Sequence, residues 1–247
     1  MSLKSRILRR GVAEPMLPPD VRVYAIGDLH GRADLLEQVV TRIEADGTRR
    51  PIDREIWIFL GDYVDRGPDT RAVLDRLILL TQSRSVVCLK GNHDRALLRF
   101  LESPDDADDL MSLGGLATAM SYGLRPTYSL NREQRASLSA DLLDAMPALH
   151  RRFLERLAVS YQLGGYFFCH AGVRPGMPLT QQQERDLLWI REDFLDHEGN
   201  FGKIVVHGHT PVDVPDVRKN RINIDTGAFA TGRLTCIALE RNDKYFV

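Results

Sequence analysis

The sequence has almost no excess of charge, few cysteines and no long hydrophobic run. Its 247 residues carry 33 Lys and Arg against 34 Asp and Glu, so a net charge of -1 gives no general attraction to nucleic acid or to an anionic membrane. No apolar run approaches the roughly 18 residues of a membrane-spanning helix. The basic residues Lys4, Arg6, Arg9 and Arg10 are not followed by the hydrophobic segment of a signal peptide. We therefore expect a cytoplasmic protein that binds neither nucleic acid nor membrane.

Cysteine is scarce and poorly placed for cross-linking. Cys88, Cys169 and Cys236 lie far apart, and each belongs to an apolar, strand-like run. An odd number of cysteines without the short spacings of zinc sites predicts buried, reduced thiols. Disulfides and thiolate-bound zinc are therefore not expected, and a metal site would have to use other side chains.

What the sequence does have is a charged turn after a strand-like run. Residues 61–67 read Gly-Asp-Tyr-Val-Asp-Arg-Gly and follow the apolar run Ile56–Leu60. This pattern predicts a buried strand that ends in a tight turn. Asp62 would then lie at the carboxyl end of the strand, where α/β folds bind ligands. Alone, such a stretch is as often only a turn, but Asp62, Asp65 and Arg66 concentrate charge that a metal ion and a phosphate would offset.

Two further strand-like runs end in the same way. Val21–Ile26 precedes Asp28, and Val86–Lys90 precedes Asn92, in each case after a glycine. Asp28, Asp62 and Asn92 are 34 and 30 residues apart, which is the length of one strand and one helix. Apolar residues recur at helical spacing between and after these strands, so the first hundred residues predict a βαβαβα arrangement with a mostly parallel sheet. The expected helices are Asp34–Ala45, Arg71–Leu80 and His93–Leu101.

The middle of the chain has a different pattern. Residues 103–156 contain no clear strand, and Gln134–Ala145 and Ala148–Leu157 have helical periodicity, so we expect a helical insertion at about 103–156. Strand patterns return at Ala158–Gln162, Tyr166–Cys169 and Lys203–Val206. Three short runs near the C-terminus suit a second, antiparallel sheet: Arg221–Ile224, Leu234–Leu239 and Lys244–Val247.

These elements predict an α/β fold in which two sheets pack as a β-sandwich and helices flank them. The length of the chain is within the range of one large domain. We therefore expect residues 1–247 to form a single domain that includes the helical insertion.

Six candidate metal ligands fall at or just past the ends of expected strands: Asp28, His30, Asp62, Asn92, His170 and His209. A set of carboxylates and imidazoles suits manganese, iron or zinc better than calcium. Six ligands are too many for one ion and suit two, with Asp62 between them. A pair of ions about 3.5–4 Å apart can stabilise both the attacking and the leaving oxygen in a phosphoryl transfer.

At these residues the sequence resembles the metallophosphoesterase (calcineurin-like) superfamily. Within it, the chain is most similar to the phosphoprotein phosphatase branch, including bacterial serine/threonine phosphatases and bacteriophage lambda protein phosphatase. The resemblance covers residues 27–210 in the order of the family, and it rests on five motifs: GDLHG at 27–31, GDYVDRG at 61–67, GNHD at 91–94, HAG at 170–172 and GHT at 208–210.

The resemblance implies two metal sites that share one ligand. Asp28 and His30 would bind the first ion, and Asp62 would bridge both ions. Asn92, His170 and His209 would bind the second ion. The resemblance implies divalent ions, with manganese as the first expectation and iron or zinc as alternatives.

The remaining implied roles concern the substrate. His93 resembles the general acid of the family, held by Asp65. Arg66 and Arg191 resemble the arginines that bind phosphate oxygens, which agrees with the match between guanidinium and phosphate geometry. Asn92 is expected to contact substrate as well as metal. Arg174 is a weaker candidate because it lies close to the HAG motif but could equally be a surface residue.

Two departures from the family pattern affect the choice of substrate. Asp94 stands where protein phosphatases of this type commonly carry Glu, which weakens that assignment slightly. The last motif lacks the second metal-binding histidine of many nuclease and phosphodiesterase relatives, and His207, which precedes Gly208, is not at a ligand position. This absence, together with the VDRG extension at 64–67, favours the phosphatase branch.

The resemblance therefore implies a metal-dependent phosphatase that hydrolyses phosphomonoesters by in-line attack of a hydroxide generated at the two ions. The expected partner is a phosphorylated protein, with phosphoserine and phosphothreonine as the reacting groups, or a small phosphoester. One alternative is a symmetrical dinucleoside tetraphosphate hydrolase, because that group of enzymes shares these motifs. An alternative of another class is a non-catalytic module that binds phosphate or protein; such a module should lack a ligand or the acid, and this sequence lacks neither.

Overall fold

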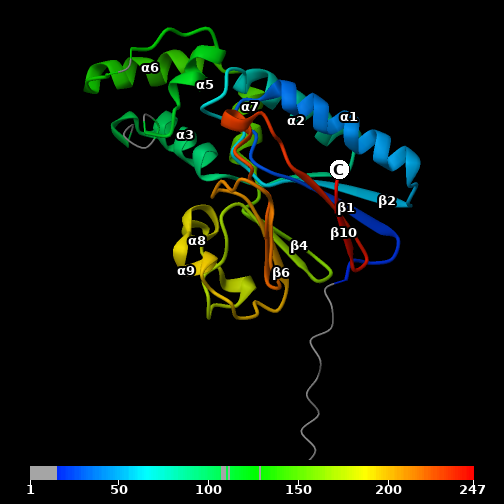
Figure 1. Cartoon of the computed structure of the whole chain (residues 1–247). Coiled ribbons are helices and arrows are strands. Elements are labelled where there is room, and N and C mark those ends of the chain that lie inside the picture. Colours follow the sequence, from blue (N-terminus) through cyan, green and yellow to red (C-terminus); the bar gives the residue numbers. More distant parts are fainter. Residues whose placement is uncertain (1–15, 107–109, 111, 128) are drawn as a thin grey trace, which may run out of the picture.

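Two five-stranded sheets, packed face to face, form the centre of the protein (Figure 1). The structure is a computed structural model that describes residues 16–106, 110, 112–127 and 129–247; the basic N-terminal residues lie outside this part. The first sheet has the strand order β10-β9-β1-β2-β3. Its strands are β1 Val21–Ile26, β2 Arg54–Phe59, β3 Val86–Cys88, β9 Cys236–Glu240 and β10 Asp243–Phe246.

The first sheet is buried on both faces, which explains why its central strands are apolar throughout. In β1, Val23 and Ala25 pack toward the second sheet, whereas Tyr24 and Ile26 pack in the other core cluster, with the helices. Successive side chains of a strand point to opposite faces, so one strand contributes to two cores. The predicted strands at 21–26 and 56–60 are confirmed within one or two residues.

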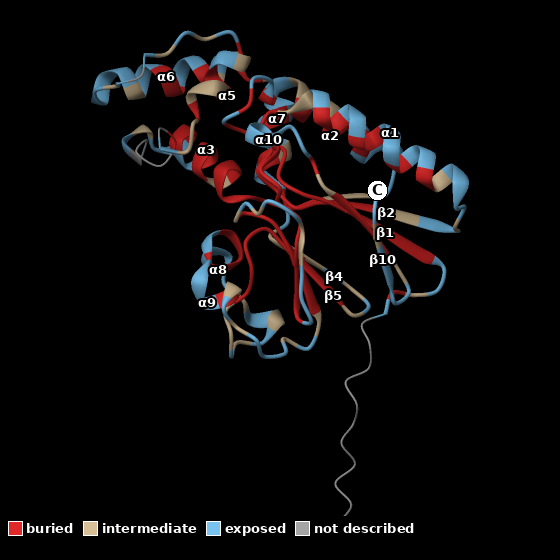
Figure 2. Ribbon diagram, in the orientation of Figure 1, coloured by how far each residue is buried: buried red, intermediate tan, exposed pale blue. Residues whose placement is uncertain are grey.

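Two long helices cover the outer face of the first sheet (Figure 1). These helices, α1 (Ala33–Arg49) and α2 (Thr70–Ser83), each bury one apolar side and expose the other (Figure 2). The buried side of α1 consists of Leu35, Leu36, Val39, Val40 and Ile43, at the spacing that predicted the helix. The next strand leads into α3 (Asn92–Glu102), which begins at a candidate metal ligand.

The second sheet has the order β4-β5-β6-β8-β7 and is mixed. Strands β5, β6 and β8 run parallel to one another, and β4 and β7 are antiparallel edge strands. The strands are β4 Ser160–Leu163, β5 Tyr166–Cys169, β6 Ile204–His207, β7 Asp216–Val217 and β8 Arg221–Asn223. Phe167, Cys169 and Val205 pack on the outer side against the short helices α8 (Glu184–Trp189) and α9 (Glu192–Leu195).

The prediction that the C-terminal runs build an antiparallel second sheet is wrong in two respects. Strand β8 joins the second sheet but lies parallel to β6. Strands β9 and β10 belong to the first sheet instead, where β9 pairs antiparallel with β1. Strand β1 is apolar on both faces and offers a free edge after pairing with β2, and β9 satisfies that edge. An alternating apolar pattern does not specify which of two free edges a strand will pair with.

The described part of residues 103–156 is helical, as predicted, and no strand is assigned within it. Its elements pack over α2 and α3 at one end of the first sheet (Figure 1). They are η1 Pro104–Asp106, α5 Leu116–Ser121, α6 Arg132–Ala145 and α7 Ala148–Glu155. The remaining short helices are η2 Leu179–Gln181 and α10 Ala228–Thr231.

The described residues also bear on two expectations from composition, which concern the cysteines and membrane-spanning helices. All three cysteines are buried and unpaired. Among the helices of the described residues, none combines the length and the apolar character that crossing a membrane requires.

Candidate active site

The candidate residues gather where the carboxyl ends of six strands meet. Strands β1, β2 and β3 are parallel in the first sheet, and β5, β6 and β8 are parallel in the second. The loop after β1 carries Asp28 and His30, and the loop after β2 carries Asp62, Asp65 and Arg66. The N-terminus of α3 after β3 carries Asn92 and His93, and the loops after β5 and β6 carry His170 and His209.

Glycines let these loops approach one another closely. A Cβ atom at Gly91 would collide with the side chain of Asp62, and one at Gly208 would collide with the carboxylate of Asp28. Only a residue without a side chain fits at these two places, so glycine before Asn92 and before His209 is required by the packing of the ligands themselves.

The carboxylate of Asp62 is shared by two groups of histidines. Its Oδ2 lies 3.5 Å from His30 Nε2 and 3.8 Å from His93 Nε2 on one side, and 3.4 Å from His170 Nε2 on the other. Candidate ligand atoms of His30, Asp62 and His93 lie within 4.8 Å of one another, and so do those of Asp62, His170 and His209. All five side chains are buried. The described residues therefore place two adjacent groups of potential ligands around one carboxylate.

The histidines are oriented as metal ligands usually are. Nδ1 of His30 lies 3.0 Å from the carbonyl oxygen of Val64, and Nδ1 of His170 lies 3.0 Å from that of Leu60. A backbone carbonyl can only accept, so each Nδ1 carries the proton and donates it, and each Nε2 faces Asp62. Donation of the second ring nitrogen to a carbonyl or carboxylate is the usual support of a histidine ligand.

Two buried polar atoms of the expected ligand set lack any hydrogen-bond partner: Asp28 Oδ1 and His209 Nε2. Burial of an unpaired carboxylate oxygen or imidazole nitrogen is costly unless a ligand completes it. Asp28 Oδ2 accepts a hydrogen bond from the backbone N–H of His209 at 3.1 Å, which ties the loops after β1 and β6 together. These orphaned atoms fit the binding of a metal ion.

The electrostatics of the site also fit a bound cation. Burial and the neighbouring carboxylate of Asp225 raise the pKa of Asp28 well above its usual range. Burial alone would lower the pKa of His170, but Asp62 and Asp28 outweigh it and raise that pKa to about 10. Burial lowers the pKa of His30 to about 3 and that of His209 to about 2. His30 and His209 are thus neutral at neutral pH, and the carboxylates favour a positive charge between them.

Asn92 and Asp94 connect the loops around the second group. The amide oxygen of Asn92 lies 2.8 Å from His170 Nε2 and 2.9 Å from His209 Nδ1, so it belongs with these two histidines as expected. The carboxylate of Asp94 accepts hydrogen bonds from the backbone N–H groups of Asp62, Tyr63 and Gly91 at 2.9, 3.0 and 2.8 Å. Asp94 therefore holds the loop after β2 against the start of α3. It does so although its side chain is shorter than the Glu that related protein phosphatases commonly carry at this position.

His93 is held by a second carboxylate. Its Nδ1 lies 2.9 Å from Asp65 Oδ2, and both side chains are buried. Asp65 is itself fixed by Thr118 of α5, which accepts from the Asp65 backbone N–H at 2.9 Å and donates to Asp65 Oδ1 at 2.7 Å. Although burial opposes it, the charge of Asp62 and the hydrogen bond to Asp65 raise the pKa of His93. This arrangement suits a histidine that holds a proton.

The two expected arginines differ in their surroundings. Arg66 Nη1 lies 3.1 Å from His30 Nε2, and its guanidinium stacks 4.8 Å from the ring of Phe229. Arg191 is exposed at the start of α9, and its Nη1 lies 3.5 Å from Thr210 Oγ1, next to His209. Arg174, the weaker candidate, is instead paired with Asp186 at 2.6 and 2.8 Å.

Three residues of this region were not predicted from the sequence: Thr118, Asp225 and Phe229. Asp225 is buried and follows β8, the same strand-end position as the other acids, so its position after a predicted strand was the available signal. Its Oδ1 accepts from the Gly227 backbone N–H at 2.9 Å. The roles of Thr118 and Phe229 could not be predicted from local sequence patterns, because their contacts join segments that are far apart in the chain.

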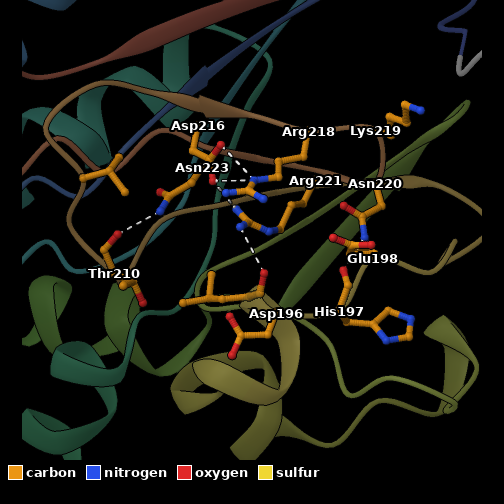
Figure 3. Close-up of a pocket in the computed structure, with 12 residues that line it drawn as sticks. Asp196, His197, Glu198, Thr210, Asp216, Arg218, Lys219, Asn220, Arg221 and Asn223 are labelled. Atoms are coloured by element: carbon orange, nitrogen blue, oxygen red, sulfur yellow. Dashed lines mark hydrogen bonds and ion pairs between the residues drawn. The ribbon is translucent and has the colours of Figure 1, made fainter.

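A pocket of about 580 Å³ lies beside this site, between α9 and strands β7 and β8 (Figure 3). Thr210, which contacts Arg191, lines this pocket, and so does Asn223, whose Oδ1 accepts a hydrogen bond from the backbone N–H of Asp225 at 3.0 Å. Its basic side chains, Arg218, Lys219 and Arg221, are equalled in number by the acidic Asp196, Glu198 and Asp216. Asp216 pairs with both Arg218 and Arg221 at 3.0 and 2.9 Å. Because the cations are balanced, the pocket itself does not favour a phosphate.

The chain is similar in sequence to one known protein family and to named bacterial proteins. The family model of the calcineurin-like phosphoesterases matches residues 21–237. Bis(5'-nucleosyl)-tetraphosphatase PrpE [asymmetrical] of Oceanobacillus iheyensis is 26% identical over 246 residues, covering 92% of this chain and 91% of the relative. The protein of the same name from Anoxybacillus flavithermus is 26% identical, covering 86% and 88%.

Solved structures support the fold. A crystal structure provisionally assigned as a diadenosine tetraphosphatase aligns with a TM-score of 0.64 at 19% identity, covering 93% of this chain and 98% of the other. A mutant cold-active protein tyrosine phosphatase aligns with a TM-score of 0.62 at 16% identity, covering 94% and 83%. The chain belongs to the calcineurin-like phosphoesterase family, and its two-sheet fold flanked by helices is the fold of that family. The general activity is therefore hydrolysis of phosphoric esters by a metal-dependent enzyme.

Proposed function

We propose that this protein is a cytoplasmic dinuclear metal-dependent hydrolase of dinucleoside tetraphosphates. The observation that carries the proposal is the position of Asp62, whose carboxylate is shared by the two groups of histidines. The substrate is proposed because relatives aligned over most of their length bear the name of this activity. Their names specify the asymmetrical form, and the proposal adopts it in place of the symmetrical form that the sequence suggested.

In the proposed site, Asp28, His30 and Asp62 would hold one ion, and Asp62, Asn92, His170 and His209 would hold the other. Manganese is the first candidate, with iron and zinc as alternatives. When bound, two such ions lower the pKa of water and polarise a phosphoryl oxygen. The donor set of carboxylates, imidazoles and an amide suits these ions.

The other residues act on the substrate. Arg66 and Arg191 bind the phosphoryl oxygens, where charge increases during the reaction. Asn92 adds an amide contact next to the reacting phosphate. His93 gives the proton held at its Nε2 to the leaving oxygen, while Asp65 keeps the ring in place through Nδ1. Water adds to one phosphorus atom and the bond to the bridging oxygen breaks, so asymmetrical cleavage yields a nucleoside monophosphate and a nucleoside triphosphate.

A second candidate activity, on phosphoserine and phosphothreonine in proteins, is favoured by the His93–Asp65 pair. The alkoxide of serine is a poor leaving group and needs a proton, whereas a nucleotide phosphate leaves readily without one. A buried histidine paired with a carboxylate is therefore more useful for a phosphomonoester than for an anhydride.

A substrate panel separates these candidates. The metal-free protein would be loaded with Mn²⁺, Fe²⁺ or Zn²⁺ and assayed with diadenosine tetraphosphate, a phosphoserine peptide, p-nitrophenyl phosphate and a phosphodiester. We expect the highest kcat/KM for diadenosine tetraphosphate, with AMP and ATP as products in equal amounts by ion-exchange chromatography. Turnover of the phosphopeptide alone would replace the proposal by the second candidate, and binding without turnover of any substrate would indicate a non-catalytic module.

A further inference from the structure

Two large aromatic side chains beside the candidate active site are unusually exposed. Phe229, in the short helix α10, exposes 38% of its surface, and Trp189, at the end of α8, exposes 40%. Most other large apolar residues near the site are buried. An exposed aromatic ring at the edge of a polar site commonly marks a surface that a ligand covers.

The two rings lie against different halves of the site. The ring of Phe229 meets the ring of His30 in a T-shaped contact with centroids 5.5 Å apart. The ring of Trp189 meets that of His209 in a similar contact at 6.3 Å. His30 belongs to the first group of potential ligands and His209 to the second, and Asp62 belongs to both groups. The contacts therefore run from Phe229 to His30, through Asp62 to His209, and then to Trp189. Phe229 and Trp189 lie at the two ends of this series.

Each aromatic ring is accompanied by an arginine expected to bind phosphate. The guanidinium of Arg66 lies 4.8 Å from the centroid of the Phe229 ring. Trp189 and Arg191 line the same surface depression, of about 310 Å³. Both ends of the site thus combine a flat apolar surface with a fixed positive charge, which is the pairing that a nucleotide requires for its base and its phosphate. The pocket of Figure 3 lacks this combination, since its lining includes no Phe, Tyr or Trp.

We infer that Phe229 and Trp189 are stacking surfaces for the two bases of a dinucleoside tetraphosphate, one at each end of the metal site. The inference rests on the proposed function and extends it, because it assigns the groups that recognise the nucleosides. The polyphosphate would extend between Arg66 and Arg191, past Asp62, and a base would lie on each ring. A substrate with a phosphate but without a base would use the same reacting centre and neither ring.

The test compares two substrates in matched variants. Phe229→Leu and Trp189→Leu keep apolar side chains but remove the aromatic faces. We expect each variant to lower the ratio of kcat/KM for diadenosine tetraphosphate to kcat/KM for phosphoserine by about 5- to 150-fold, the range measured for loss of one stacked base. Trp189→Phe should restore most of that ratio. Phe246→Leu alters a residue of similar exposure, 51%, on the edge strand β10, and should leave the ratio unchanged.

Fluorescence gives a second readout that does not depend on turnover. The chain has two tryptophans, and Trp57 is only 1% exposed, so a ligand that changes the emission by contact acts on Trp189. A diadenosine tetraphosphate analogue with methylene bridges should change the emission of the Zn²⁺-loaded protein, inorganic tripolyphosphate should not, and Trp189→Phe should abolish the change.

The outcomes separate this inference from the function on which it rests. If the wild-type protein hydrolyses phosphoserine but not diadenosine tetraphosphate, the proposed function fails, and the stacking surfaces fail with it. If the wild-type protein hydrolyses diadenosine tetraphosphate and neither leucine variant changes the ratio, the stacking surfaces alone are refuted.

Discussion

Five non-glycine residues of the candidate site have left-handed backbone conformations: His30, Asp62, Asp65, Arg66 and His209, with φ between 43° and 70°. Such conformations cost about 1–3 kcal/mol each unless the surroundings enforce them, and they concentrate at functional sites. Here the enforcement is visible in the hydrogen bonds of Asp94 and Thr118 to the loop after β2. The strained turns aim their side chains at one place, which no local propensity would predict.

At the residue scale, His93 can be distinguished from the metal ligands by its effect on leaving groups. His93→Asn should lower turnover of phosphoserine by about 10²–10⁴-fold, since the alkoxide then leaves without a proton. Turnover of p-nitrophenyl phosphate should fall much less, because its phenolate is weakly basic. Bound metal, measured by elemental analysis, should stay at the wild-type level.

His197→Asn, in the pocket of Figure 3, is the control and should change neither substrate. Equal losses on both substrates, or a loss of metal from His93→Asn, would reassign His93 to ligation, which its place in the first group of potential ligands also permits.

Arg191 provides a second test at the same scale. Its side chain is exposed and contacts Thr210 beside His209, so its loss should leave the fold and the ligands intact. Arg191→Ala should raise KM or lower kcat for phosphomonoesters, with metal content unchanged. Arg218→Ala removes an equally charged residue that is paired with Asp216, and its kinetics should match the wild type. Kinetics of Arg191→Ala that match the wild type would remove Arg191 from the site.

At the scale of elements, helix α5 contacts the His93–Asp65 pair through the hydroxyl of Thr118. Thr118 makes two hydrogen bonds to Asp65 and lies 3.3 Å from the hydroxyl of Thr70 at the start of α2. Loss of the hydroxyl would leave one Asp65 oxygen and one N–H unpaired in a buried place. The helical insertion is therefore expected to position His93 by fixing Asp65.

Thr118→Val, which keeps the shape of the side chain, should reduce turnover of phosphoserine more than turnover of p-nitrophenyl phosphate. Thr118→Ser, which keeps the hydroxyl, should restore most of the difference. A purely structural role would predict equal losses on both substrates, or a loss that serine does not rescue.

Some of these elements and contacts could be predicted from the sequence, and others could not. The strands before Asp28, Asp62 and Asn92 were predictable because an apolar run followed by glycine and a polar residue is a local signal, and the strands before His170 and His209 were predictable from their short apolar runs. The pairing of β9 with β1 was not predictable, since both sheets offered an edge to the same pattern. The contact of Thr118 with Asp65 joins positions 53 residues apart, and the ring contact of Phe229 with His30 likewise joins distant segments of the chain. Such contacts follow from the packing of whole elements.

At the scale of the whole molecule, the candidate ligands join the two sheets. Asp28, His30, Asp62 and Asn92 come from loops of the first sheet, and His170 and His209 come from loops of the second. A ligand that binds only the folded state stabilises it by about 2.7 kcal/mol at a hundredfold excess over its Kd. Ions held between the sheets should therefore raise the midpoint of thermal unfolding.

Removal of metal with a chelator should lower that midpoint by roughly 5–10 °C for a chain of this size. Differential scanning calorimetry of the metal-free and Mn²⁺-loaded protein measures the change, and His209→Ala should reduce the difference. An identical midpoint with and without metal would mean that the ions are not held between the sheets.

The most direct test of the account is the number of ions bound per chain, measured by elemental analysis together with activity, in the wild-type protein and in Asp62→Asn. Because Asp62 is shared by both groups of ligands, we expect two divalent ions per chain in the active wild-type protein. In Asp62→Asn we expect fewer ions and no measurable turnover of diadenosine tetraphosphate or phosphoserine. Full activity in protein shown to be free of metal, or two ions and normal turnover in Asp62→Asn, would contradict the two-metal site.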